Sequence, residues 1–446
     1  MRRREQYEFG EFTLDVPERR LLRGGACVHL PPKAYDVLVM LVREAGRLVT
    51  KQELLALVWP EAFVEEGILT VHVSSLRRAL GDSNSSPSYI ETVPRSGYRF
   101  VASVTRSTVA ERAASPRPVS RTLEALELVG HGRAHLLSAS YFQLPNAVES
   151  FQAAIALDPT YAAAHAGLAL AKCAQAQMRS APVEESYHEA KAAALRALAM
   201  DDECADAQVA LGKVLLLSEW DWTGAERSFA RALAINPNDT EAYLHYGTLM
   251  EALGRLQEGL ELKQQALERD PFSPLVHVQL ATSYWNQRRY DEAIVWASKA
   301  LDLDPRHLLA REFVAGAYWK KGDLDRFLAE NVRQAESFGC REDQLRAVRR
   351  GCDEIRRAFD AGGRPAVTRY MLEQMPRQQS GLAIRLAVLH GELGELDAAF
   401  EHLDRALDSR DPSLVHLAVA PQWDALRGDA RFNERLTRMG LHPAAS

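Results

Sequence analysis

The sequence predicts an α+β helix-turn-helix domain with a β-hairpin at the N-terminus, followed by an all-α array of helical repeats. Three observations support this fold class. Residues 67–81 read GILTVHVSSLRRALG, in which apolar residues recur at the spacing of an amphipathic helix. Two strand-like runs around a short turn follow within residues 89–101. Farther along, Pro237, Pro271 and Pro305 are 34 residues apart, and such a fixed period indicates repeats.

The composition is ordinary for a globular chain of 446 residues, with 47% hydrophobic residues, 26% charged residues and a net charge of −6. A chain of this length is expected to form two or more compact units. Residues 1–104 hold 14 Lys and Arg and 13 Asp and Glu, a net charge of +1, and the remainder holds 40 and 47, a net charge of −7. If the chain binds DNA, a local patch in the first hundred residues must do so.

The spacing of the cysteines and the length of the apolar runs exclude several kinds of site and protein. Five cysteines are scattered without a CxxC pair, so the sequence indicates no disulfide framework, no zinc site and no other cofactor. No run approaches the roughly 18 apolar residues of a membrane span, which argues against a membrane-tethered receptor. We expect a cytoplasmic protein with reduced thiols.

The first fifty residues predict a small antiparallel sheet and a helix. Aromatic and aliphatic residues from Tyr7 to Leu14 and from Leu21 to Leu30 lie in short runs, the second of which contains a Gly24-Gly25 turn. Pro31 and Pro32 then open a helix with apolar residues at helical spacing, and Gly46 ends it.

The next segment predicts two further helices in tight succession. Thr50 and Glu53 form a capping-box pattern, and Val49 and Leu54 occupy the positions of a hydrophobic staple. This helix is expected to stop at Pro60, and the helix at residues 67–81 begins a few residues later, which gives a helix-turn-helix.

The third helix has two different faces. Its apolar stripe consists of Leu69, Val73, Leu76 and Leu80, which we expect to face a core. The opposite face carries small hydroxyl residues, one valine and two arginines, without an acidic residue. Small side chains suit a major groove, and arginine can pair with guanine or phosphate. A solvated charged helix face is the alternative interpretation of the same pattern.

The ordered segments KAYDVLVMLVREAGRLVTKQELLALVWP, TVHVSSLRRALGD and IETVPRSGYRF resemble the winged-helix effector domain of OmpR/PhoB-type transcriptional regulators over residues 7–104. In that family the third helix enters the major groove, and the wing reaches the adjacent minor groove or the backbone. The resemblance implies double-stranded promoter DNA as a partner. It implies base-edge contacts from Thr70, Val71, Ser74 and Ser75, phosphate contacts from Arg77 and Arg78, and wing contacts from Thr92, Arg95 and Tyr98.

The sequence departs from the family pattern at two places. Many relatives carry arginine where this chain has Ser74 or Ser75, so direct guanine readout is expected to be weaker. Pro94 stands where some members place a minor-groove arginine, so Arg95 contacts either the minor groove or a phosphate. His72 is expected to orient or pack rather than to catalyse, because no acid or nucleophile motif accompanies it.

Residues 105–121 lack aromatic residues and contain Pro116 and Pro118, which predicts a flexible linker. Residues 122–446 then resemble tetratricopeptide repeats, because the 34-residue phrase carries small residues at the positions where paired helices meet. We count about seven repeats, an irregular helical stretch at 340–378, and a C-terminal cap that includes Trp423, Phe432 and Leu441.

Such repeats stack into a solenoid with a concave surface that binds proteins or peptides. Trp285 and Trp319 occupy the same repeat position on the helix that normally lines this surface. With Asn286 and Lys320 they are candidates for a partner groove. The alternative is that both tryptophans pack between repeats, which is the commoner use of buried aromatic residues.

Together these features predict a transcriptional regulator whose helix-turn-helix domain binds a specific DNA sequence and whose repeats sense a signal or bind a protein. The alternative is an interaction scaffold whose DNA-binding domain is non-specific or vestigial. The sequence carries no Walker loop, GxSxG, HExxH or kinase motif, so we predict no enzyme and no catalytic residue. Domains related to the first hundred residues often bind tandem half-sites, which suggests a homodimer on DNA.

Overall fold

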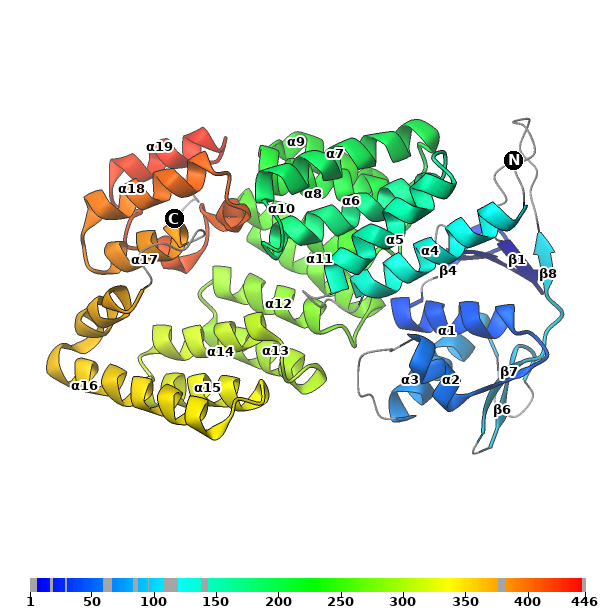
Figure 1. The fold of residues 1–446 in the computed structure, drawn as a ribbon, viewed down its shortest axis with the longest axis horizontal. Helices are drawn as coiled ribbons and strands as arrows, with labels where there is room; N and C mark the ends of the chain where they lie inside the picture. Colours follow the sequence, from blue (N-terminus) through cyan, green and yellow to red (C-terminus); the bar gives the residue numbers. More distant parts are fainter. Residues whose placement is uncertain are drawn as a thin grey trace. The chain divides into compact units, whose positions relative to one another are not determined.

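The computed structural model of this chain describes residues 6–16, 19–28, 30–58, 66–82, 87–94, 96–107, 119–137, 143–375 and 382–442. Figure 1 shows its helices and strands. The packing divides the chain into two compact units, one of Met1–Val214 with Arg227–Ala242 and the other of Leu215–Glu226 with Tyr243–Ser446. Three predicted features lie outside the described residues: Pro60, Arg95 and residues 108–118 of the linker.

The predicted N-terminal sheet is present and has five strands in the order β4-β3-β2-β1-β8. All neighbouring strands run antiparallel. Gly24 and Gly25 join β3 to β4 with positive φ angles of 56° and 88°, a conformation that glycine adopts without steric cost. The strands are β1 (Gln6–Phe9), β2 (Phe12–Asp15), β3 (Arg20–Arg23), β4 (Ala26–Val28) and β8 (Thr105–Ser107).

The structure corrects both ends of the linker predicted at residues 105–121. At its start, Thr105 pairs with Glu8 and Ser107 pairs with Gln6 in the sheet as part of strand β8. At its end, residues 119–121 belong to helix α4 (Val119–Leu137). Residues 105–107 carry no strong strand signal of their own, and pairing with an existing edge strand places them in the domain.

Three helices follow the sheet, as predicted: α1 (Pro32–Arg43), α2 (Lys51–Val58) and α3 (Glu66–Leu80). The capping box at α2 is confirmed. The backbone N–H of Glu53 donates to Oγ1 of Thr50 at 3.1 Å, and the backbone N–H of Thr50 donates to Oε2 of Glu53 at 2.7 Å. Val49 and Leu54, the predicted staple, are both fully buried. This start of α2 fixes where the helix-turn-helix begins.

The predicted hairpin is also confirmed. Strands β6 (Ile90–Val93) and β7 (Gly97–Phe100) pair antiparallel, and β5 (Leu48–Thr50) pairs with the other edge of β7. The ring of Phe100 packs edge-on against that of Phe9 with centroids 5.0 Å apart. The two sheets and α1–α3 therefore share one hydrophobic core.

The remainder of the described chain is helical, apart from turns and connections (Figure 1). The α-helices are α4 (Val119–Leu137), α5 (Leu144–Leu157), α6 (Ala162–Gln177), α7 (Val183–Met200), α8 (Ala205–Val214), α9 (Trp222–Ile235), α10 (Thr240–Ala252), α11 (Leu256–Arg269), α12 (Pro274–Asn286), α13 (Tyr290–Leu303), α14 (Leu308–Lys321), α15 (Leu324–Ser337), α16 (Glu342–Glu373), α17 (Ala383–Glu392), α18 (Leu396–Asp408) and α19 (Ala430–Arg438). A π-helical turn, η2 (Leu215–Glu219), precedes α9, and two 3₁₀ turns, η3 (Pro412–His416) and η4 (Pro421–Trp423), precede α19.

Small residues at the repeat positions allow the helices to pack closely, as the repeat pattern predicts. Ala154, Ala232 and Ala300 are completely buried. A Cβ atom added at Gly212 would lie 2.6 Å from the ring of Phe229, which is too close for any residue except glycine without movement of the ring. The helix–turn–helix repeats therefore depend on these small side chains.

The irregular stretch expected at 340–378 is helix α16, which is interrupted near its middle. Gly362 and Gly363 have non-helical backbone angles, and Gly363 has a φ of +64°. Two residues later Pro365 removes a backbone donor, which also favours an interruption here. The predicted C-terminal cap is a compact cluster in which Trp423, Phe432 and Leu441 are buried.

Candidate nucleic-acid interface

Helix α3 buries one face and exposes the other, as its periodicity predicts. Leu69, Val73, Leu76 and Leu80 are at most 2% exposed. The exposed residues of α3 recur at three- and four-residue steps and form one line along the helix. We call this line the recognition stripe. It consists of Gly67, Thr70, Val71, Ser74 and Arg78.

The stripe contains no acidic side chain, and its residues are small until the last turn. The hydroxyl of Ser74 donates to the backbone carbonyl of Thr70 at 2.8 Å, one helical turn earlier. Val71 is 43% exposed, which makes it one of the larger apolar exposures in the domain. Ser75, which the sequence placed beside Ser74, is half-buried at the edge of the stripe.

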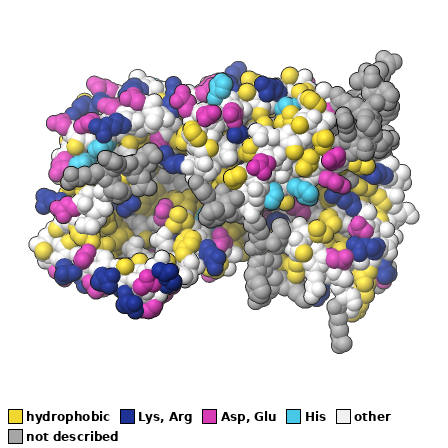
Figure 2. Space-filling view, in the orientation of Figure 1, with side chains coloured by type: hydrophobic (Ala, Val, Ile, Leu, Met, Phe, Trp, Pro, Cys, Tyr) yellow, Lys and Arg dark blue, Asp and Glu magenta, His cyan; other side chains and the backbone are white. Residues whose placement is uncertain are grey.

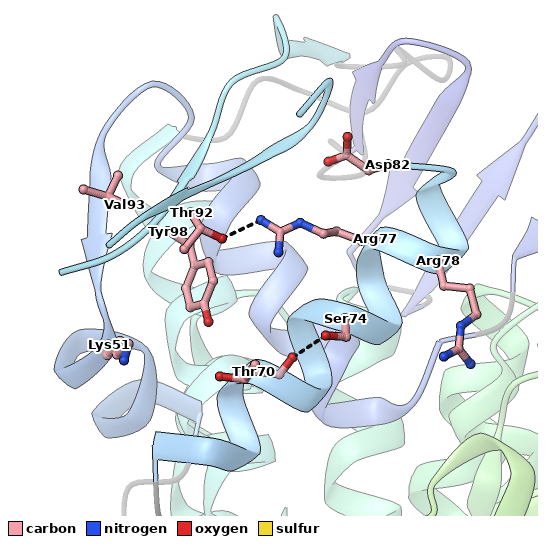
Figure 3. Close-up of a pocket in the computed structure, with 9 residues that line it drawn as sticks. All are labelled: Lys51, Thr70, Ser74, Arg77, Arg78, Asp82, Thr92, Val93 and Tyr98. Carbon is pink, nitrogen blue, oxygen red and sulfur yellow. Dashed lines mark hydrogen bonds between the residues drawn. The ribbon is translucent and has the colours of Figure 1, made fainter. Parts of the chain in front are cut away.

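Arg77 contacts the wing. Its Nη2 donates to the carbonyl of Ile90 at 2.8 Å and to the hydroxyl of Thr92 at 2.7 Å. Figure 3 shows the guanidinium directed from α3 toward the wing strand, whereas the side chain of Arg78 leaves the helix on a different side. Arg77 therefore braces the wing against the third helix, a role that the sequence did not predict. None of the described residues forms an ion pair with Arg78.

The wing residues differ in their accessibility. Thr92 is exposed and pairs in register with Tyr98, which is only 4% exposed. Tyr98 nevertheless lines the cleft between the wing and α3, and Figure 3 shows its hydroxyl directed into that space. Glu91, the acidic residue of the wing, is paired with Arg99 at 2.9 Å. The wing therefore presents little uncompensated negative charge.

The third helix and the wing enclose a cleft of about 560 Å³. Its lining residues, shown in Figure 3, are Lys51, Thr70, Ser74, Arg77, Arg78, Asp82, Thr92, Val93 and Tyr98. The carboxylate of Asp82 accepts backbone N–H groups from Ser88, Tyr89 and Ile90 at 2.7, 3.1 and 2.7 Å. These bonds compensate its charge and fix the start of the wing.

Lys51 is a member of this site that the sequence analysis missed. It is the first residue of α2, and its backbone N–H donates to the carbonyl of Ser96 in the wing turn at 3.1 Å. The available signal was its position directly after the capping residue Thr50, where the helix N-terminus attracts anions. A cation at this end of α2 suits a phosphate group.

His72 lies on the buried side of α3, in agreement with the packing role that we expected. It is 1% exposed. Burial, together with the nearby charge of Lys33, lowers the pKa of His72 to about 4. The imidazole is therefore neutral at pH 7 and contributes no charge to the interface.

The four residues of the predicted partner groove differ in how far their side chains are exposed, which we did not expect. Trp285 is half-buried and packs edge-on against Tyr290 and Phe313, with ring centroids 5.4 and 5.6 Å away. Its indole N–H also points to Oε1 of Gln422 at 3.4 Å. Trp285 therefore fits the packing alternative that the sequence left open.

Asn286 is 1% exposed and cannot line an open groove. Its Nδ2 donates to Oε2 of Glu251 at 3.1 Å and lies 3.3 Å from Nδ1 of His416. Glu251 also pairs with Lys263 at 2.9 Å, and both side chains are completely buried. Burial lowers the pKa of Lys263, while the carboxylate opposes that shift. Asn286 thus belongs to a buried polar network that joins α10, α11, α12 and η3.

Trp319 and Lys320 remain accessible in part. The ring of Trp319 stacks at a tilt on Phe327 and lies 5.3 Å from the guanidinium carbon of Arg364. Lys320 pairs with Glu392 at 3.6 Å. Figure 2 shows a hollow lined by hydrophobic side chains among the helices of the second unit.

Two further findings concern membranes and metals. No helix within the described residues combines the length and apolarity needed to cross a bilayer. In that same part of the chain, no group of three or more His, Cys, Asp and Glu side chains has the arrangement of a metal site.

Comparison with known proteins agrees with the geometry. Residues 25–100 match the family described as transcriptional regulatory protein, C terminal, and residues 216–282 and 274–307 match tetratricopeptide repeats. The transcriptional regulator HilA of Salmonella typhi is 38% identical over 122 residues, 27% of this chain and 21% of that protein. The regulatory protein KdpE of Mycobacterium tuberculosis is 41% identical over 96 residues, 21% of this chain and 42% of that protein.

A solved structure of the Klebsiella pneumoniae RstA DNA-binding domain in complex with the RstA box is 30% identical, with a TM-score of 0.20. It covers 22% of this chain and 96% of that chain. The chain spans about a fifth of the length of HilA and about two fifths of that of KdpE. The chain therefore carries an N-terminal winged-helix domain of the OmpR/PhoB type, homologous to those of HilA, KdpE and CadC, followed by tetratricopeptide repeats.

Proposed function

We propose that this protein is a transcriptional regulator that binds promoter DNA sequence-specifically through α3 and the wing. The observation that carries the proposal is the recognition stripe, whose five exposed residues include no acidic side chain and lie beside a β-hairpin. Its small side chains permit close approach to base edges in the major groove. Lys51 and Arg78, which both line the cleft, would contact phosphates.

The alternative, an interaction scaffold with a vestigial DNA-binding domain, is less well supported. A vestigial surface has no reason to remain free of acidic groups or to keep its nearby carboxylates compensated. In this domain Asp82 is held by three backbone donors and Glu91 by Arg99. These arrangements favour a surface that approaches a polyanion.

A charge introduced into the stripe tests the proposal. Ser74→Glu places a carboxylate against the groove, and we expect it to abolish the electrophoretic shift of promoter DNA by the full chain. Thr437→Glu is the matched control, because Thr437 is also an exposed helical residue whose hydroxyl donates to the carbonyl four residues earlier. Both variants should retain the wild-type circular dichroism spectrum. Equal DNA binding by the two variants would contradict the proposed interface.

We also propose that the protein is not an enzyme, that it acts in the cytoplasm where promoter DNA is accessible, and that it binds tandem half-sites as a homodimer. The dimer is suggested by the mode of binding of related domains. Mass photometry of the full chain with one or two half-sites tests it. A single copy on a complete two-site duplex at saturation would contradict the dimer.

The tetratricopeptide repeats mediate protein interaction, and we propose that the partner or signal binds the surface that includes Trp319 and Lys320. The partial exposure of both side chains supports such a surface, and Figure 2 shows a hollow lined by hydrophobic side chains in the same unit. Trp285 is unsuitable as a test because it packs between helices. Proteins from the native host can be captured on the wild-type chain and on two variants. A partner of this surface should be lost with Lys320→Glu and retained with the exposed control Arg405→Glu. Retention by both variants would exclude Lys320 from the surface.

A further inference from the structure

The recognition stripe presents mainly methyl and hydroxyl groups, with a cation only at its C-terminal end. In its first three turns it offers the methyl groups of Thr70 and Val71 and the hydroxyl of Ser74, and no cation. Arg78 comes only in the last turn of α3. In helix-turn-helix domains the N-terminal part of the recognition helix contacts base edges. The base-reading part of this helix is therefore apolar and hydroxylic.

Guanine is usually read by arginine or lysine, which donates two hydrogen bonds to O6 and N7. Arg77 could have served this purpose, but its Nη2 is shared between Ile90 and Thr92 of the wing. Ser74 and Ser75, which lie toward the N-terminal end of α3 from Arg77, carry no cation, and Arg78 follows Arg77 in the last turn. The guanidinium of Arg77 therefore braces the wing and is not directed at a base.

The remaining groups match an A·T pair. Such a pair displays the thymine methyl group and the adenine N6 amino group in the major groove. Val71, 43% exposed, offers apolar surface for the methyl group. The hydroxyl of Ser74 donates its hydrogen to the carbonyl of Thr70. Its oxygen can still accept a hydrogen bond, which suits the N6 amino group of adenine.

We infer that Val71 is a specificity-determining residue that contacts a thymine methyl group, and that the half-site of this protein is centred on A·T pairs rather than on guanine. This inference rests on the proposed function and names the DNA sequence class that the same surface recognises.

The first experiment determines the half-site by enriching random duplexes on the full-length chain. The inference predicts a motif whose positions facing α3, mapped by methylation and missing-base interference, are A·T pairs. A motif with guanine at those positions overturns the inference and leaves the proposed function intact. Absence of any enriched motif overturns both, because sequence-specific binding itself has then failed.

The second experiment removes single methyl groups by replacing each thymine with deoxyuridine. One thymine should show about fourfold weaker binding of wild-type chain, which corresponds to about 0.8 kcal/mol for one buried methyl group. Val71→Ala should bind the thymine site more weakly and should lose the difference between thymine and deoxyuridine.

Val101→Ala is the matched control, because Val101 is similarly exposed, at 42%, and lies outside α3. It should retain the fourfold discrimination. The inference is overturned if no thymine is sensitive in wild-type chain, or if Val71→Ala discriminates thymine from deoxyuridine as wild-type chain does. Both variants shorten an exposed side chain, so that circular dichroism should confirm an unchanged fold.

Discussion

Arg77 and Arg78 are adjacent arginines that we expect to respond differently to the same substitution. The side chain of Arg77 makes two hydrogen bonds to the wing, whereas Arg78 is exposed and lies along the recognition stripe. Hydrogen bonds from a charged donor contribute about 1.5–3 kcal/mol when buried. Because Arg77 is only half-buried, we expect Arg77→Ala to destabilise the wing by about 1–2 kcal/mol in total.

Hydrogen exchange of the wing strands measures this local loss of stability. It does not require the whole chain to unfold in a single two-state transition. A loss of about 1–2 kcal/mol makes the exchange of peptides from β6 and β7 about 5- to 30-fold faster. Thr92→Val removes one of the two acceptors and leaves the charge of Arg77 in place, so it should reproduce part of the increase. The Arg77→Ala, Thr92→Val double variant should show less than the sum of the two effects.

The salt dependence of DNA binding separates bracing from phosphate contact. Loss of one phosphate contact reduces the slope of log K against log salt by about 0.9. Arg78→Ala should show this reduction with unchanged exchange of the wing. Arg77→Ala should weaken binding at every salt concentration with the slope unchanged. A reduced slope for Arg77→Ala, with wild-type exchange of the wing, would refute the bracing role and restore the phosphate contact that the family resemblance implies.

Three further predictions concern stability. Thr50→Ala removes the N-cap of α2 and should cost about 1 kcal/mol, measured as faster exchange of α2, whereas Thr50→Ser should not. Lys263→Met leaves the buried carboxylate of Glu251 without its cation and should cost about 3–5 kcal/mol in urea unfolding of the second unit, and adding Glu251→Gln should recover part of it. The pKa of His72 is lowered from 6.5 to about 4, so the folded state resists protonation; stability above pH 6.5 is unaffected and falls between pH 6.5 and 4. That acid-dependent loss should be smaller in His72→Phe, and an identical pH profile would contradict it.

Much of the interface is encoded in local sequence. The Thr50–Glu53 capping box and the stripe of Leu69 and Val73 depend only on residues within two helical turns of one another, so they could be read directly. The 34-residue recurrence of small residues similarly predicts close helix pairs, because each pair meets at the same positions.

The hydrogen-bond partners of polar side chains were harder to predict. The sequence allows many possible pairs, and only the fold brings one of them together. The arginines at 77 and 78 are chemically identical, yet the register of β6 brings Thr92 to one of them. Strand β8 was likewise missed, because residues 105–107 become a strand only through pairing with β1.

The sequence by itself determined which faces of the helices are buried, where the helices start, and that a helix-turn-helix precedes helical repeats, because burial periodicity and capping are local properties. Only the tertiary structure decided which partner each polar side chain contacts. Asn286 looked like part of an open surface until the fold brought His416, 130 residues later, against it. Hydrogen bonds join groups by distance in space, and separation along the chain carries little information about that distance.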